Sequence, residues 1–111
     1  MLLDIFNMAP KAIAGFKGGE GEALVRMHQD EMGKVAQITL PVGASIGYHT
    51  HEDSYEVIYV LSGSGTCYDG DQVYPVSAGM VQYCPQFDGH SIVNTGTEEL
   101  KLLGIIPNRE V

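Results

Sequence analysis

Short runs of strand-forming residues, separated by turn residues, constrain the fold of this chain more than any other feature. Gly, Pro, Asn and Asp fall between the runs, where tight turns favour them. Short strands at nearly regular spacing are typical of β-sandwiches and β-barrels. The runs expected to form strands are residues 23–28, 35–40, 56–61, 66–68, 72–76, 80–84, 90–93 and 100–106. The sequence therefore predicts an all-β fold.

The length of the chain fits one domain. It has 111 residues, of which 44% are hydrophobic and 18% charged, enough to build one core. Within it we expect an N-terminal segment over residues 1–21, a barrel over 22–107 and a C-terminal tail over 108–111. The N-terminal segment is weakly patterned, and we expect it to pack on the barrel or on a partner subunit.

The charge balance excludes several kinds of partner. The formal net charge is −8, from 14 Asp and Glu against six Lys and Arg. Such a surface repels nucleic-acid phosphates and anionic lipid headgroups. We therefore expect a small-molecule ligand, and neither nucleic acid nor a membrane, as the partner.

The N-terminus and the cysteines indicate a location. The opening MLLDIFNM carries Asp4 within its apolar run and has no basic leader, and no apolar stretch approaches the roughly 18 residues of a membrane helix. Cys67 and Cys84 form no CxxC pair. We expect a cytoplasmic protein with two free thiols, although the sequence leaves a disulfide between them open.

The run at 56–61 predicts an additional interface. Alternation puts Glu56, Ile58 and Val60 on one face of a strand and Val57, Tyr59 and Leu61 on the other. Both faces are largely apolar, and a small barrel covers only the inner one. We therefore expect a homodimer, with cover by the N-terminal segment alone as the alternative.

Four side chains carry the expected chemistry. His49 and His51 are two apart, so on a strand both imidazoles point to the same side and can reach one metal ion. Glu56 starts the next strand after the polar turn at 52–54, from which its carboxylate can point back toward the pair. His90 follows much later and would close the site from a distant strand. These four residues are the predicted ligands of one divalent metal ion.

The spacing of these residues resembles that of the cupin superfamily. The first cupin motif is matched by Gly43, His49, His51, Glu56 and Gly63 at every fixed position, and most of the second by Gly79, Pro85, His90 and Asn94. One position departs from the pattern, because Phe87 stands where the family usually has glycine two residues after the proline. We expect a differently shaped turn there, with Phe87 at the pocket mouth.

The resemblance implies a double-stranded β-helix, which is a single-domain jelly-roll barrel, around the metal. Three imidazoles and one carboxylate leave two positions of an octahedral ion open for water, dioxygen or substrate. Fe, Mn, Ni and Co suit that geometry, and Zn would also bind.

Two functions follow from an open metal site. The first is a metalloenzyme of the dioxygenase, isomerase or lyase type acting on a small oxygen-rich or carboxylate substrate. The alternative is a non-catalytic sensor or binding module, and a purely structural metal is a third possibility. Cupins resembling oxalate decarboxylase carry an Arg three residues before the first motif histidine. Ile46 stands there in this chain, which argues against oxalate decarboxylation by that scheme.

The catalytic residues themselves are unknown from the sequence. Residues near the motifs that could assist at the metal are Tyr48, Tyr83, Gln37, Gln82 and Cys84. For each of them a place in the core or at the rim is an equal alternative. The fourth histidine, His28, has no spaced partner and is expected at the surface.

Overall fold

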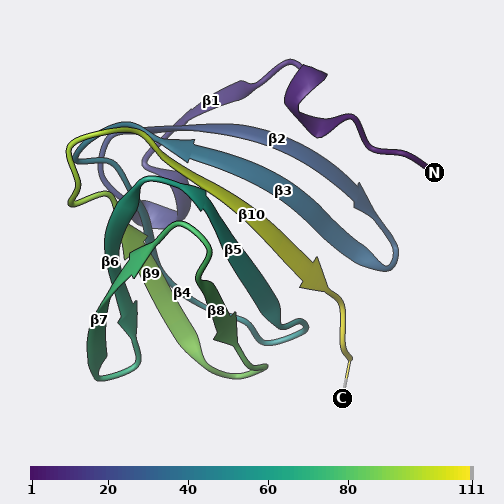
Figure 1. The fold of residues 1–111 in the computed structure, drawn as a ribbon. Coiled ribbons are helices and arrows are strands. Elements are labelled where there is room, and N and C mark those ends of the chain that lie inside the picture. Colours follow the sequence, from purple (N-terminus) through teal and green to yellow (C-terminus); the bar gives the residue numbers. More distant parts are fainter. Residues whose placement is uncertain (111) are drawn as a thin grey trace.

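Ten β-strands and two 3-10 helices make up the regular structure in the computed structural model, which describes residues 1–110 (Figure 1). In chain order they are η1 (Ile5–Asn7), β1 (Lys11–Ala14), η2 (Phe16–Gly18), β2 (Glu22–Asp30), β3 (Gly33–Leu40), β4 (Ser45–Thr50), β5 (Glu56–Ser62), β6 (Ser64–Asp69), β7 (Gln72–Ser77), β8 (Val81–Cys84), β9 (Gly89–Val93) and β10 (Leu100–Pro107). The predicted all-β fold is confirmed.

The strands form two antiparallel sheets. One has the order β1-β2-β3-β10-β5-β8 and the other the order β4-β9-β6-β7. The chain crosses between the sheets at short turns, such as the one between β5 and β6, where Gly63 has a φ of 86°. An added Cβ at Gly63 would lie 2.4 Å from the Glu99 carbonyl oxygen, so only glycine fits this crossing.

The core fills the space between the inward faces of the two sheets. Every second residue of β5 and β10 is buried there, including Ile58, Val60, Leu100 and Leu102. Ile92 of β9 meets them from the other sheet. Fully burying one such side chain contributes about 1.5–3 kcal/mol, so the core fixes which residues of each strand can reach the interior.

The structure adds two strands to those expected from the apolar runs. β1 lies within the weakly patterned N-terminal segment and pairs with β2 at the edge of the larger sheet. β4 holds the first metal-motif histidine and pairs with β9. β4 lies outside the apolar runs, but Ile46, Tyr48 and Thr50 favour a strand, in agreement with the strand expected for the His49–His51 pair.

The N-terminal segment does not cover the outer face of β5. It extends the opposite edge of the sheet, and its Met8 carbonyl accepts a 2.9 Å hydrogen bond from Arg26 Nε. Tyr59 of β5 remains 42% exposed, beside exposed Val81 and Tyr83 of β8. The apolar outer face that led us to expect a homodimer is therefore open in the single chain.

Within the described part of the chain, no helix has the length and apolar character required to cross a bilayer.

Candidate metal centre

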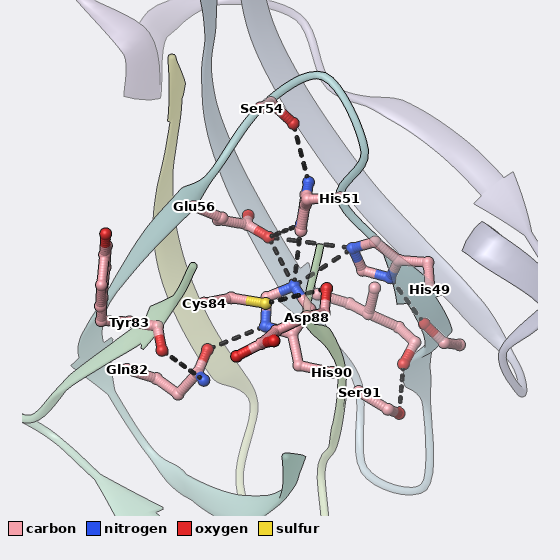
Figure 2. A network of polar contacts seen from close by, with 12 residues as sticks. His49, His51, Ser54, Glu56, Gln82, Tyr83, Cys84, Asp88, His90 and Ser91 are labelled. Carbon is pink, nitrogen blue, oxygen red and sulfur yellow. Dashed lines mark hydrogen bonds and ion pairs between the residues drawn. The ribbon is translucent and has the colours of Figure 1, made fainter. Parts of the chain in front are cut away.

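Four side chains from both sheets meet in one cluster (Figure 2). His49 belongs to β4 and pairs directly with His90 of β9, so these two imidazoles are neighbours across one ladder. His51 lies just after β4. Glu56 is the first residue of β5 in the facing sheet, and its carboxylate points across to the three imidazoles.

A register shift in β4 decides which of its side chains faces the interior. The β4–β9 pairing slips between Ile46 and His49, so both residues face inward although their numbers differ by three. Tyr48 then points outward, against Gly89. Gly47 stands within the irregular stretch, where an added Cβ would lie 2.6 Å from the Gly19 backbone nitrogen. Close approach of the η2 loop therefore requires glycine at 47.

The donor atoms converge on a common centre. Glu56 Oε1 lies 2.8 Å from His90 Nε2, 3.0 Å from His51 Nε2 and 3.8 Å from His49 Nε2. His90 Nε2 lies 3.1 Å from His51 Nε2 and 3.2 Å from His49 Nε2. Two donors at right angles around one metal, each at about 2.1 Å, would be about 3.0 Å apart. The four side chains form a group that could hold one metal ion.

Each imidazole is oriented through its other nitrogen. His49 Nδ1 donates to the Gly47 carbonyl at 2.8 Å, His90 Nδ1 donates to Gln82 Oε1 at 2.8 Å, and His51 Nδ1 bonds Ser54 Oγ at 3.0 Å. A carbonyl oxygen only accepts, so the Nδ1 of His49 and of His90 carries a proton. Nε2 is then the atom that binds a metal ion, or that donates to Glu56 when no ion is bound and the ring is protonated. Fixing the ring in this way is typical of metal-binding histidines.

The carboxylate of Glu56 remains charged in this buried setting. Burial raises the pKa of Glu56, but hydrogen bonds from His49, His51 and His90 outweigh burial and bring the net pKa well below its ordinary value. An added Cβ at Gly104 of β10 would lie 2.8 Å from Glu56 Oε2. Glycine at 104 thus leaves room for an anionic ligand group at the centre of the cluster.

A cavity of about 400 Å³ leads from the cluster to the surface. Its wall includes His49, His51 and Glu56, whereas His90 is only 1% exposed and does not line it. The other lining residues are Phe16, Lys17, Val25, Met27, Lys34, Ala36, Ile38, Ile46, Thr50, Glu52, Asp53, Ser54, Ile106 and Asn108. The cluster is therefore accessible to a small molecule on one side.

The five assisting residues suggested by the sequence have different positions. Gln82 touches His90, and Cys84 lies opposite Glu56 in the β5–β8 ladder. Tyr48 and Tyr83 are about half exposed and do not line the cavity. Gln37 is buried on the other face of β3, where it is hydrogen-bonded to Arg26 and Thr39. The structure brings two of the five to the cluster.

The remaining sequence-derived sites lie away from the cluster. His28 pairs with Asp30 at 3.0 Å near the end of β2. Ser54, which orients His51, was not singled out, although its place in the polar turn before Glu56 was a usable signal.

We expect the Gln82→Ala variant to bind divalent metal about 10–100-fold more weakly, the range found when an outer partner of a metal ligand is lost. The variant leaves the buried His90 Nδ1–H without its acceptor and frees the ring to turn. Competition titration against a chelating dye measures the affinity. Gln82→Glu keeps an acceptor and should bind as the parent does, and exposed Gln29→Ala is the control. Unchanged affinity in Gln82→Ala would contradict the orienting role.

Both cysteines should resist alkylation in the folded protein. Cys67 and Cys84 are buried free thiols. Burial, and then the nearby carboxylates of Glu56, Asp69 and Asp88, raise the pKa of Cys84 to about 12, and burial also raises the pKa of Cys67. We expect no labelling by iodoacetamide at pH 8 until urea unfolds the chain, followed by two adducts in the mass spectrum. Rapid labelling of Cys84 in the native state would contradict this.

The turn before His90 keeps the backbone that a glycine would favour. Phe87 has a φ of 75°, in the left-handed region that bulky residues rarely adopt. Its N–H donates to the His51 carbonyl, and the His51 N–H donates to the Asp88 carbonyl at 3.1 Å. The ring is 64% exposed and lies outside the cavity over the cluster. The departure from the cupin motif therefore leaves a strained residue next to His51. Phe87 lines a second hollow with Glu52, Asp53 and Glu110, two of which also line the cavity over the cluster.

Replacing Phe87 with glycine should stabilise the protein by about 1 kcal/mol, since relief of the left-handed strain exceeds the added chain entropy of glycine. Urea unfolding of the metal-free protein measures the change. The control is Val42→Gly, another exposed turn position but without positive φ, which should lose stability. Equal losses in both variants would refute the strain argument.

Comparison with known proteins agrees with this geometry. A sequence model described as a cupin domain matches residues 36–106. The oxalate-binding protein of Thermotoga maritima is 33% identical over an alignment of 113 positions, gaps included. The alignment covers 96% of this chain and 93% of that protein. An uncharacterized protein of Methanocaldococcus jannaschii is also 33% identical, over 62% of this chain and 55% of its own length.

Solved structures extend the likeness to the whole chain. A predicted oxalate decarboxylase from Thermotoga maritima has a TM-score of 0.92 at 31% identity, over 97% of this chain and 99% of that one. A double-stranded β-helix protein from Klebsiella pneumoniae, at 18% identity and a TM-score of 0.74, shares the fold, over 86% of this chain and 91% of its own. The cupin domain model matches most of the chain, both motifs are in place, and residues of both sheets converge at the histidines. The chain therefore belongs to the cupin family.

Proposed function

We propose that this chain is a metal-dependent binding protein for a small dicarboxylate, with oxalate as the first candidate. The observation that carries the proposal is the convergence of three histidines and one glutamate, of which His49, His51 and Glu56 line a cavity that is also lined by two lysines. Further support comes from the oxalate-binding protein of Thermotoga maritima, which aligns over nearly the whole chain.

His49, His51, Glu56 and His90 would hold the ion through three Nε2 atoms and one carboxylate oxygen. A bound divalent ion would supply a Lewis-acidic centre with a net charge near +1 and two open positions in octahedral geometry. Fe, Mn, Ni, Co and Zn all accept this donor set.

The cavity supports a small anion as the ligand. Its volume of about 400 Å³ is at the lower end of the usual range for small-molecule pockets. Lys17 and Lys34 line it, which is two of the six basic residues of a chain with a net charge of −8. Glu52, Asp53 and Glu56 line it as well, so a bound divalent ion is needed to make the cavity favourable for an anion.

Binding is favoured over decarboxylation because no guanidinium lines the cavity. Ile46 occupies the wall where cupins resembling oxalate decarboxylase have Arg. Arg26 is bonded to Gln37 and to the Met8 carbonyl, and Arg109 is bonded to Gln86. A small carboxylate can thus be held in the cavity without the group that grips oxalate for cleavage in that scheme.

Isothermal titration of oxalate into the Mn(II)-loaded and the metal-free protein tests the proposal. We expect saturable binding of one oxalate per chain in the loaded form only. Acetate serves as the control for general anion binding and should bind much more weakly. Absence of oxalate binding to the loaded protein, or equal binding to the metal-free protein, would overturn the proposal.

A metalloenzyme of the dioxygenase, isomerase or lyase type is the second candidate, favoured by the open cavity above the cluster. Dioxygen uptake by the Fe(II) form tests the dioxygenase, and conversion of small keto acids and diketones by the Fe(II), Mn(II) and Ni(II) forms tests the isomerase and the lyase. Absence of turnover in both assays removes this candidate. The homodimer and the cytoplasmic location stay part of the proposal. Sedimentation at the mass of one chain would remove the dimer, and recovery from an oxidising compartment would remove the location.

A further inference from the structure

One lysine occupies a strand position that normally belongs to the core. In β3 the inward side chains are Ala36, Ile38 and Leu40, which are all buried. Lys34 is two residues before Ala36 and so points to the same side of the sheet. It is half-buried and lines the cavity above the cluster. A charged group at an inward position requires a reason, because partial burial of an ammonium costs free energy.

Lys34 and Glu56 stand in one row across the inner face of the larger sheet. Lys34 pairs with Ile106 of β10, and Ile105 pairs with Val57 of β5, so Ile106 lies between Lys34 and Glu56. Neighbouring strands are about 4.8 Å apart, so the Cα atoms of Lys34 and Glu56 are separated by roughly 10 Å. A four-carbon stem can carry the ammonium over part of that distance.

The ammonium of Lys34 has no ion-pair or hydrogen-bond partner in the described part of the chain. Among residues 1–110, the ion pairs involve only histidines with Asp30 or Glu56, and Lys34 makes no side-chain hydrogen bond. The carboxylates of Glu52 and Asp53 line the same cavity without pairing with it. A half-buried cation without an internal partner, facing a cavity, is suited to bind an anion from outside.

Lys17 is a weaker candidate for the same role. It comes from the η2 loop, it is exposed, and its Nζ lies 5.9 Å from the centroid of the Phe16 ring. Its place at the rim depends on an irregular loop, whereas Lys34 is fixed in register on a central strand. A charge on a regular strand has the better defined position for recognising a ligand.

We propose that Lys34 is the specificity-determining residue of the cavity, selecting dianions by binding the charged group of the ligand that lies away from the histidine–glutamate cluster. This inference rests on the proposed function, and it deepens it by naming the residue that separates dicarboxylates from monocarboxylates. An acetate ion, with a single carboxylate, has no second group for Lys34 to hold.

Three variants and two ligands test the inference. Lys34→Met keeps the length of the stem and removes the charge, and Lys34→Arg restores a cation. Lys101→Met is the matched control, because Lys101 is on β10 of the same sheet but its neighbours Leu100 and Leu102 face the core, so it faces outward. Each variant is loaded with Mn(II), its metal affinity is measured, and it is then titrated with oxalate and with acetate.

We expect Lys34→Met to weaken oxalate binding by about tenfold or more, the effect of removing one charged partner from a partly buried pair. Its affinity for Mn(II) should be unchanged and its affinity for acetate should fall by much less than that for oxalate. Lys34→Arg should bind oxalate nearly as the parent does, and Lys101→Met should match the parent. Oxalate affinity within about twofold of the parent in Lys34→Met, or an equal loss for acetate, would overturn the inference.

Failure of the inference is distinguishable from failure of the proposed function. If the parent protein binds no oxalate, the choice of oxalate is wrong, and the same titrations are made with malonate, succinate and inorganic phosphate. The role of Lys34 is supported if one dianion of that set binds to the parent about tenfold more tightly than it binds to the Lys34→Met variant. Equal binding of every dianion to both proteins, or no dianion binding at all, overturns it.

Discussion

Glu56→Gln is expected to bind divalent transition metals about 100-fold or more weakly than the parent, beyond the range for losing an outer partner. Glu56 is the only anionic donor in the cluster, and its Oε1 is the atom that all three imidazoles approach. The amide keeps the shape of the side chain but removes the charge that favours a cation. Competition titration with a chelating dye at pH 7.5 gives both affinities.

The control for this prediction is Glu22→Gln, which removes the same charge from an exposed position on β2. It should bind metal as the parent does. An equal, small loss in both variants would mean that only the overall negative charge of the protein attracts the cation. Unchanged affinity in Glu56→Gln would remove Glu56 from the ligand set.

Metal loading should raise the melting temperature by more than about 10 °C when free metal exceeds its dissociation constant a thousandfold, since that excess contributes about 4 kcal/mol. The four donors come from both sheets, so an ion held between them ties the sheets together only in the folded chain. Scanning calorimetry with Mn(II), and then with excess EDTA, measures the shift. A shift below about 2 °C would contradict binding between the sheets.

The rise in melting temperature on metal loading should also depend on pH. Metal binding requires neutral imidazoles, so the stabilisation by metal is larger at about pH 7–8 and becomes smaller as protons compete with the metal at lower pH. In the metal-free protein, the pKa of Glu56 is lower in the folded chain than its ordinary value of 4.5. The contribution of its charge is therefore present above pH 4.5 and lost as the pH falls below it. A metal-induced shift that persists unchanged at pH 5 would contradict imidazole ligands.

The sequence was sufficient to predict the fold class and the four converging residues because the signals were regular. Apolar runs predicted most strands, and the i, i+2 spacing of His49 and His51 needs no long-range information. The approach of His90 to His49 depends on the pairing of β4 with β9, which no local pattern contains. Only the spacing of the two motifs made that approach predictable.

Other features could not be predicted because the sequence did not show which side chains of a strand face the interior. In β3 both faces are largely buried, so nothing in residues 35–40 indicates that Gln37 faces away from the cluster. In β4 the register shift between Ile46 and His49 reverses the alternation and turns Tyr48 outward. Lys34 could have been noticed by extending the inward face of β3 by two residues, but its strand was expected to begin at 35.

Elemental analysis of the parent protein and of His90→Ala, both purified without added metal and then dialysed against Mn(II), tests the four-residue metal centre most directly. His90 is the most buried of the three histidines and the one that joins the distant motif to the others. We predict about one equivalent of divalent metal per chain in the parent and a small fraction of that in His90→Ala. Equal metal content in the two proteins, or none in the parent, would contradict a metal centre built from these side chains.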